Sequence, residues 1–221
     1  MLSDTERTRV AAAVAAAEAR SDGEIVTVIA PESDGYGDVV AHWSMLLALL
    51  GLALAAASPG PWVALLAGVR GGWSVPTLGE LLFVLLLLAT LLFVAGRLLF
   101  GAPAVRRAMI PAGTATRRVR RRAILLFRLS VESRTRARTG VLVYLSLAER
   151  RAEIVADAAI NERVAPETWG AAMALLVAGV RDGRPAEGMI DAVERIGAVL
   201  AEHFPRSPDD TNELPDRLIL L

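Results

Sequence analysis

Two long apolar runs dominate the hydropathy pattern of the chain. They extend over residues 43–57 and 81–94, and neither contains a charged residue. A helix rises about 1.5 Å per residue, so roughly 20 apolar residues are needed to cross the hydrocarbon core of a bilayer. The second run reaches that length if residues 78–100 are taken whole. The pattern predicts a transmembrane hairpin of two helices over residues 39–103.

The first apolar run is interrupted by Pro59-Gly60-Pro61. Proline removes a backbone donor and kinks or ends a helix. Residues 62–69, which are again apolar, therefore lie at the membrane interface or extend the first span beyond a kink. The sequence leaves both alternatives open.

The segments that flank the hairpin have the patterns of one α/β domain. Ser3-Asp4-Thr5-Glu6 is typical of a helix start, because a hydroxyl cap is followed three residues later by a carboxylate. The β-branched residues 25–29 predict a strand. After the hairpin, residues 116–138 predict a long basic helix, and residues 140–146 and 152–157 predict a β-hairpin.

Two amphipathic helices and a short strand are predicted at the end of the chain. Pro166 and Pro185 suit first helical positions, and apolar residues recur behind each proline at helical spacing. The apolar residues 218–221 suit an edge strand. We predict a small central sheet sandwiched by helices, built from residues 1–34 and 114–221 and interrupted by the hairpin.

Composition excludes several classes of protein. The chain has 221 residues, of which 54% are hydrophobic, and its formal net charge is zero. Cysteine is absent, which excludes thiol catalysis, disulfides and thiolate metal sites. The start of the chain lacks the basic and apolar stretches of a signal peptide.

Arginine is distributed unevenly around the two predicted spans. Arg70 is the one basic residue of the connection 58–77. The stretch after the second span contains eight, namely Arg97, Arg106, Arg107, Arg117, Arg118, Arg120, Arg121 and Arg122. Short basic flanks remain in the cytoplasm. We therefore expect a multi-pass protein of the inner (cell) membrane whose soluble domain is cytoplasmic.

The segment 138–150, RTGVLVYLSLAER, resembles the TPM domain family, and Thr135 also fits the family pattern. The strand that ends with Ile154-Val155-Ala156-Asp157 is similar to the next family motif. Residues 23–28 resemble the family's first strand, and Trp169, Phe204-Pro205 and Asn212-Glu213-Leu214-Pro215-Asp216 resemble a bacterial membrane-protein branch. The resemblance covers almost all of the soluble chain.

The resemblance implies an α/β sandwich, an acid phosphatase activity assigned to the family, and divalent cations bound by some members. Plant members are thylakoid proteins linked to photosystem II repair. Many relatives have a cleaved signal and display the domain outside the cytoplasm. This chain departs from that layout, because its domain is split by a hairpin and is expected inside.

Three carboxylates are candidate ligands for a divalent cation. Glu24, Glu149 and Asp157 would provide the hard oxygens that Ca²⁺ or Mg²⁺ prefers, if the fold brought them together. The structural alternative is that Asp157 caps the following turn and that Glu149 pairs with a neighbouring arginine. No cofactor is required by any motif.

Phosphatase chemistry needs a nucleophile or a metal-bound water and positive groups for the phosphoryl oxygens. Arg138 and Arg150 would supply the charge, and Thr139 or Ser146 a hydroxyl. No phosphate-binding glycine loop is present, and the two histidines suit structural positions. The ligand-binding candidates are Arg138, Thr139, Glu149, Arg150 and Asp157.

Three functions remain open after these observations. The first is a binding module for membrane-protein partners or for self-association, with a role in membrane-protein or envelope maintenance. The second is a divalent-metal-assisted phosphatase of the TPM type. In the third the hairpin is the active part and packs against another membrane helix through its small residues, Gly51, Ala53, Ala55, Ala56 and Ala57. The basic cluster 117–122 suits the lipid bilayer and not nucleic acid, because no aromatic residues are interleaved for base stacking.

Overall fold

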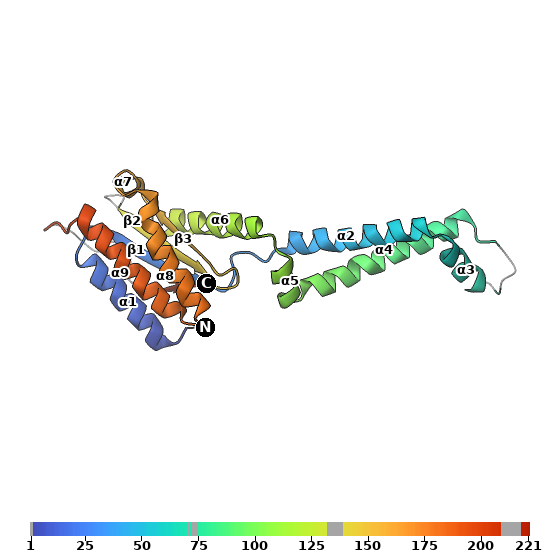
Figure 1. Cartoon of the computed structure of the whole chain (residues 1–221), viewed down its shortest axis with the longest axis horizontal. Helices are drawn as coiled ribbons and strands as arrows, with labels where there is room; N and C mark the ends of the chain where they lie inside the picture. The colour runs from blue at the N-terminus through green and yellow to red at the C-terminus, as the bar shows by residue number, and fades with distance from the viewer. Residues whose placement is uncertain (1, 70, 72–74, 132–138, 209–217) are drawn as a thin grey trace. The chain divides into compact units, whose positions relative to one another are not determined.

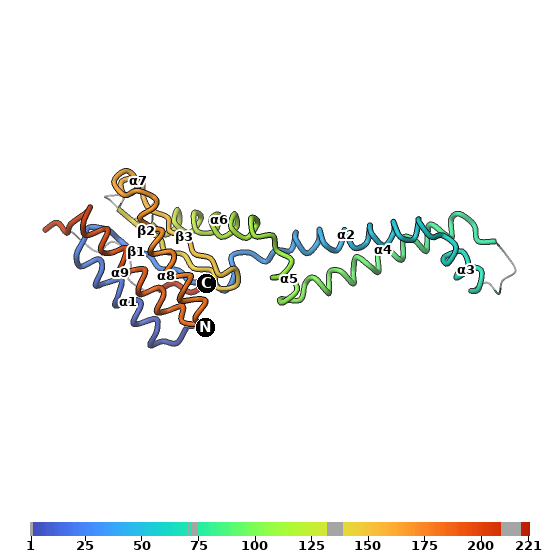
Figure 2. The backbone as a smooth tube through the Cα atoms, in the orientation of Figure 1, coloured from blue at the N-terminus to red at the C-terminus, as the bar shows by residue number. Residues whose placement is uncertain are grey.

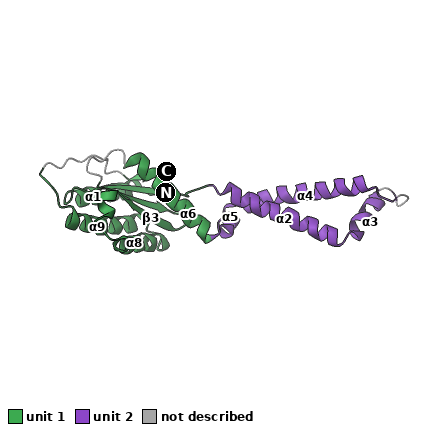
Figure 3. Cartoon of the chain, turned by 90° about the horizontal axis from the view of Figure 1, so that it is seen from above, with its two compact units in different colours: residues 1–34, 112–221 green, residues 35–111 purple. Residues whose placement is uncertain are grey.

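The chain divides into two compact units in this computed structural model. Figure 3 shows them in two colours: one unit comprises residues 1–34 and 112–221, and the other residues 35–111. The residues that the structure describes are 2–69, 71, 75–131, 139–208 and 218–221.

The first unit is a sheet domain assembled from both ends of the chain (Figure 1). Its elements are α1 (Asp4–Glu18), β1 (Glu24–Ala30), α6 (Ala112–Ser130), β2 (Gly140–Ser146), β3 (Arg151–Ala156), α7 (Ala158–Asn161), the 3-10 helix η1 (Pro166–Thr168), α8 (Trp169–Arg181), α9 (Pro185–His203) and β4 (Ile219–Leu220). The four strands form one mixed sheet in the order β3-β2-β1-β4. The predicted α/β class with a small sheet is confirmed, and membership of the TPM family stays a prediction.

Strand β1 lies in the interior of this sheet, although it precedes the hairpin in sequence. It pairs in parallel with β2 from Glu24 opposite Gly140 to Ala30 opposite Ser146. Figure 2 shows the two strands side by side. Strand β3 pairs antiparallel with β2, and β4 pairs with β1 at its far end. The predicted β-hairpin, the edge strand and the pairing of the first strand with the hairpin are all confirmed.

Each face of the sheet is buried by helices. Ile25 and Ile29 of β1 point into a core formed with α1, α8 and α9. Val26 and Val28 point the opposite way, into a second core formed with α6. Side chains alternate between the two faces of a strand, so every residue of β1 is buried on one face or the other. Strand β1 therefore contributes to both cores.

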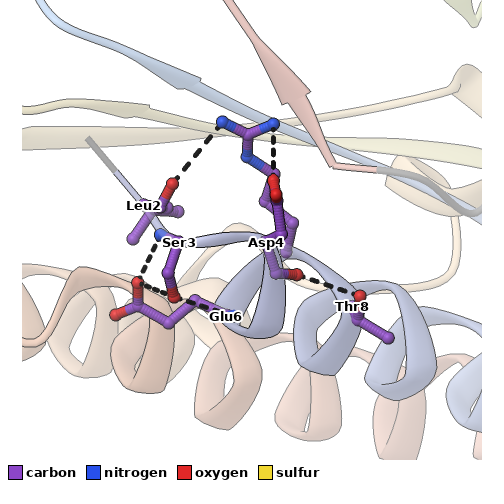
Figure 4. A network of polar contacts seen from close by, with 6 residues as sticks. Leu2, Ser3, Asp4, Glu6 and Thr8 are labelled. Atoms are coloured by element: carbon purple, nitrogen blue, oxygen red, sulfur yellow. Dashed lines mark hydrogen bonds and ion pairs between the residues drawn. The ribbon is translucent and has the colours of Figure 1, made fainter.

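Helix α1 begins with the predicted capping box, drawn in Figure 4. The Glu6 N–H donates to Ser3 Oγ at 3.2 Å, and the Ser3 N–H donates to Glu6 Oε2 at 2.7 Å. The Ser3 N–H and the Ser3 hydroxyl both donate to the Glu6 carboxylate and hold its pKa below its ordinary value. At its other end α1 stops at Glu18.

The second unit contains the two long apolar helices. Its elements are α2 (Gly37–Ala57), α3 (Gly60–Val69), α4 (Leu78–Gly101) and α5 (Pro103–Met109). Helices α2 and α4 are each long and apolar enough to cross a membrane, by length and composition. The stretch 62–69 belongs to the separate helix α3, which begins after the break at Pro59.

Small residues of α2 pack within this unit, against α4. A Cβ on Gly96 of α4 would lie 2.9 Å from the Ser44 Cα, and one on Gly51 would lie 2.1 Å from Leu92 Cδ1. Ala55 is also buried. Gly51 and Ala55 therefore take part in intramolecular packing, which corrects the hypothesis that they form a surface for another helix. Ala53, Ala56 and Ala57 remain exposed.

Two other differences from the predictions have local causes. The basic helix begins at Ala112 and ends at Ser130, before the predicted end at residue 138. Residues 132–138 lie outside the described part of the chain. Helix α7 was not predicted, because four residues are too few for a helical pattern to be detected.

Candidate functional site

The amino ends of β1 and β2 hold two of the predicted carboxylates. Glu24 lies opposite Gly140 across the two strands. Asp157 follows β3 on the other side of β2, and its N–H donates to the Gly140 carbonyl oxygen at 2.9 Å. The Gly140 N–H donates in return to Asp157 Oδ2 at 3.1 Å. Glu24 and Asp157, both buried, therefore lie at the same end of the sheet.

Thr139 and Glu18 complete this end of the sheet. The Thr139 hydroxyl donates to the Asp22 carbonyl oxygen at 2.8 Å, and the Glu24 N–H donates to the Thr139 carbonyl oxygen at 3.2 Å. The Ile25 N–H donates to Glu18 Oε1 at 2.7 Å. Each of these side chains bonds to the backbone of a strand or of the segment beside it. The arrangement fixes where the parallel strands begin.

Glu18 is a buried carboxylate that the sequence analysis missed. Its exposed fraction is 8%, against 6% for Glu24 and 4% for Asp157. All three take part in further interactions. A signal was present, because Val10, Val14 and Ala17 form the apolar stripe of α1 and Glu18 occupies the next position of that stripe. A carboxylate inside an apolar stripe indicates a buried polar contact.

Glu149 lies at the opposite end of the sheet, in the turn between β2 and β3. Its carboxylate accepts a bond from the Ser146 hydroxyl and another, at 2.9 Å, from the Ser33 N–H. The Ser33 and Tyr144 hydroxyls are 3.0 Å apart, within hydrogen-bonding distance. Burial raises the pKa of Tyr144, so its hydroxyl stays protonated at neutral pH. This network ties the segment after β1 to the β2–β3 turn.

The chain leaves for the apolar helices from this second end. Asp34 closes the first part of the domain and forms an ion pair with Arg118 of α6 at 2.9 Å. Arg151, at the start of β3, donates to the Ala112 carbonyl oxygen at 3.4 Å. Arg150 adopts a left-handed conformation, with φ of 50°, that turns the chain between β2 and β3. The residues on both sides of the hairpin are therefore held at one end of the sheet.

The predicted three-carboxylate metal site is not assembled. Glu149 and Asp157 are separated by the length of the seven-residue strand β2, which is roughly 20 Å at about 3.3 Å per residue. Within the described ranges, no group of three or more His, Cys, Asp or Glu side chains is arranged to hold a metal ion. The predicted set Glu24, Glu149 and Asp157 thus does not fit Ca²⁺ or Mg²⁺. The antiparallel turn sends Glu149 and Asp157 to opposite ends of the sheet.

The other predicted ligand residues divide in the same way. Thr139 lies beside Asp157, whereas Arg150 and Ser146 lie at the end of the sheet that holds Glu149. Arg138 falls outside the described residues. Asp157 precedes α7, but its side chain makes no capping bond to that helix and binds Gly140 instead. Glu149 binds the Ser146 hydroxyl and the backbone N–H of Ser33.

The comparisons with known proteins support the fold of the chain and nothing about its activity. No family model and no curated protein matches the chain. It resembles the NMR structure of the BA42 protein from the psychrophilic bacterium Bizionia argentinensis. The TM-score is 0.58 and the sequence identity 18%, over 100% of this chain and 96% of that one. The similarity supports the α/β architecture and carries no activity across.

Proposed function

We propose that the chain is a multi-pass protein of the inner membrane whose cytoplasmic TPM-type domain binds membrane-protein partners. Maintenance of membrane proteins or of the envelope is the role that this arrangement suits. The observation that supports binding most directly is that the ligand-binding candidates Asp157, Glu149 and Thr139 make hydrogen bonds that hold the fold together. Asp157 and Glu149 accept bonds from backbone N–H groups, and the Thr139 hydroxyl donates to a backbone oxygen.

The exposure of the apolar helices supports membrane insertion. In the most apolar window of 18 residues, 22% of the residues are buried for α2 and none for α4. A core helix of a soluble protein would bury most of that window. Exposed Leu50, Leu82 and Phe83, among other large side chains, match a hydrocarbon environment.

The assembly of the sheet domain supports an even number of crossings. Strand β1 precedes the hairpin and β2 follows it, yet they pair over seven residues. Two segments of one sheet must lie on the same side of a membrane. The arginines from Arg97 to Arg122 favour the cytoplasmic side.

A divalent-metal-assisted phosphatase is the second candidate. It is favoured by the burial of Glu24 and Asp157 at the same end of the sheet as Thr139, although the described residues assemble no three-ligand metal site. Its test is turnover of a phosphomonoester by the purified full chain, with and without Mg²⁺ or Ca²⁺. We expect no metal-dependent turnover at a typical enzyme rate, which is roughly 1 to 10³ per second.

Topology is tested by cysteine labelling, because the chain contains no native cysteine. Val75 and Ser207 are exposed and lie on the predicted outer and inner sides. Val75→Cys is expected to react with an impermeant maleimide in intact cells, and Ser207→Cys only after lysis. The reverse pattern would contradict the cytoplasmic assignment.

Binding is tested by photo-crosslinking of the full chain in its own membrane. Leu175 of α8 is 38% exposed and apolar, which makes it a suitable position for a photoreactive residue. We expect a discrete adduct with a membrane protein or with a second copy of this chain. The matched control is Glu194, an exposed polar position on α9. Equal adducts from both positions, or metal-dependent turnover without any adduct, would overturn the binding proposal.

A further inference from the structure

Helix α6 has one face on the sheet and another that points away from it. The sheet side comprises Ala115, Val119, Ala123 and Phe127, all buried. The outer side, here called the arginine–leucine face, comprises Arg117, Arg121, Leu125, Arg128 and Leu129, all exposed. At 3.6 residues per turn these five residues cluster opposite the buried stripe. Leu125 is 48% exposed and Leu129 65% exposed, although the helix has a sheet to pack against.

The charge of this face is not balanced by carboxylates. Helix α6 contains no Asp or Glu. Across the described part of the chain, Arg117, Arg121 and Arg128 form no ion pair, and Arg117 donates instead to the Thr114 hydroxyl at 3.2 Å. Arg118 falls on the same arc, between Leu125 and Leu129, but it is only partly exposed and pairs with Asp34. The three arginines of the outer face are therefore available to an external anion.

The combination of arginines and leucines matches a surface that is anionic and apolar at once. An interfacial helix places leucines at the boundary of the acyl chains and its basic residues at lipid phosphates. Arginine binds phosphate oxygens through two parallel N–H groups. Helix α6 begins at Ala112, directly after the unit that holds the two apolar helices. A membrane surface is thus close to it along the chain.

We propose that the arginine–leucine face of α6 binds the headgroups of anionic phospholipids in the membrane that holds the hairpin. The inference rests on the proposed membrane insertion. Near an anionic surface each arginine contributes roughly a fivefold factor to the docking equilibrium. Three of them would contribute a factor on the order of 100. Docking of α6 should therefore require anionic lipid.

The test uses the full chain in nanodiscs of phosphatidylcholine, alone or with added phosphatidylglycerol. A fluorophore on Leu129→Cys reports contact with brominated lipids through quenching. We expect strong quenching with phosphatidylglycerol and little with phosphatidylcholine alone. Substitution of Arg117, Arg121 and Arg128 by Gln should abolish the difference. Equal quenching in both lipids, or none in either, would overturn the proposal.

Two controls separate this inference from the proposed membrane insertion. A fluorophore on Leu86→Cys of α4 should be quenched in both lipid mixtures if the hairpin lies in the bilayer. Quenching at Leu86 without quenching at Leu129 would overturn only the role of α6, whereas failure at Leu86 would overturn both. Substitution of Arg20, Arg181 and Arg195 by Gln removes the same charge from exposed positions on other elements and should leave the result unchanged.

Discussion

Asp157 is the residue whose substitution best separates a structural role from a functional site. Asp157 is 4% exposed, and its carboxylate accepts the Gly140 N–H at 3.1 Å. Asp157→Asn keeps the shape and an acceptor oxygen but removes the charge. Asp157→Ala removes the acceptor altogether. If the bond to Gly140 is the main role of the side chain, the two variants should differ in stability in a defined order.

The magnitudes follow from the kind of hydrogen bond that is lost. A bond to a charged acceptor contributes about 1.5–3 kcal/mol and a neutral one about 0.5–1.5 kcal/mol. Asp157→Asn should therefore cost about 1 kcal/mol. Asp157→Ala leaves the buried Gly140 N–H unpaired and should cost about 2–3 kcal/mol.

The assay uses a single buried cysteine in a chain that has none. Ala192 of α9 is fully buried, and a cysteine there is accessible to a thiol reagent only when the sheet domain opens. Labelling against urea concentration gives a midpoint and a slope for each variant. We expect the urea midpoint to be highest for the wild type, lower for Asp157→Asn and lowest for Asp157→Ala. The slope should be the same for all three.

Two results would refute this reasoning. The first is an Asp157→Ala variant that is as stable as Asp157→Asn, since the Gly140 bond would then contribute nothing. The second is an Asp157→Asn variant of unchanged stability that loses a metal-dependent phosphatase activity of the wild type. That outcome would make Asp157 a site residue and would promote the enzyme over the binding module.

Three further predictions concern stability, each measured as the urea midpoint of the same cysteine reporter. Gly179→Ala should destabilise the domain by about 1–3 kcal/mol, because a Cβ there would lie 2.6 Å from the Gly188 Cα. The control Gly170→Ala meets no atom within 4 Å and should be neutral or stabilising. Equal effects of the two substitutions would exclude close packing of α8 on α9 as the cause. Burial raises the pKa of Glu153 above its ordinary value of 4.5, although Arg120 and Arg151 oppose the shift. The folded state then binds more protons than the unfolded state, so the stability of the wild type falls as pH rises from 4.5 through the folded pKa. Glu153→Gln should therefore stabilise the domain at pH 7 and lose that gain below about pH 4.5. A gain in stability that does not depend on pH would contradict this prediction. Thr27 Oγ1 is buried and has no hydrogen-bond partner among the described residues, so Thr27→Val should stabilise by about 1 kcal/mol, and a loss of stability would indicate a partner for the hydroxyl.

Much of the fold could be predicted because its signals are local. The capping box at Ser3, the β-branched strand around Val26 and the proline that opens α9 each act within one turn or one strand. The apolar runs identify α2 and α4 by length and composition alone. The end of α6 at Ser130 was missed, because basic residues with good helix propensity continue beyond it.

The candidate site could not be predicted to the same degree, because it depends on which strand ends meet. Glu24 and Asp157 were predicted to be metal ligands, whereas the structure places them on either side of Gly140, a neighbour that is defined by strand register. Glu149 was grouped with them as a third oxygen ligand, and the antiparallel turn separates it from Asp157. A register is set by the packing of whole strands, and short sequence motifs do not contain that information.

The hairpin solves a problem that the split domain creates. Strand β1 pairs with β2, which follows far along the chain. Closing a loop between such distant segments has an entropy cost that grows with loop length. Within the hairpin unit, Arg97 donates to the Gly37 carbonyl oxygen and Arg106 to the Gly35 carbonyl oxygen, each at 3.1 Å. These bonds connect the beginning of the unit to its last segments, so the two chain ends return to one place when α2 packs on α4. The effective loop between β1 and β2 is then much shorter than the sequence separation. A packed hairpin therefore favours assembly of the sheet that it interrupts.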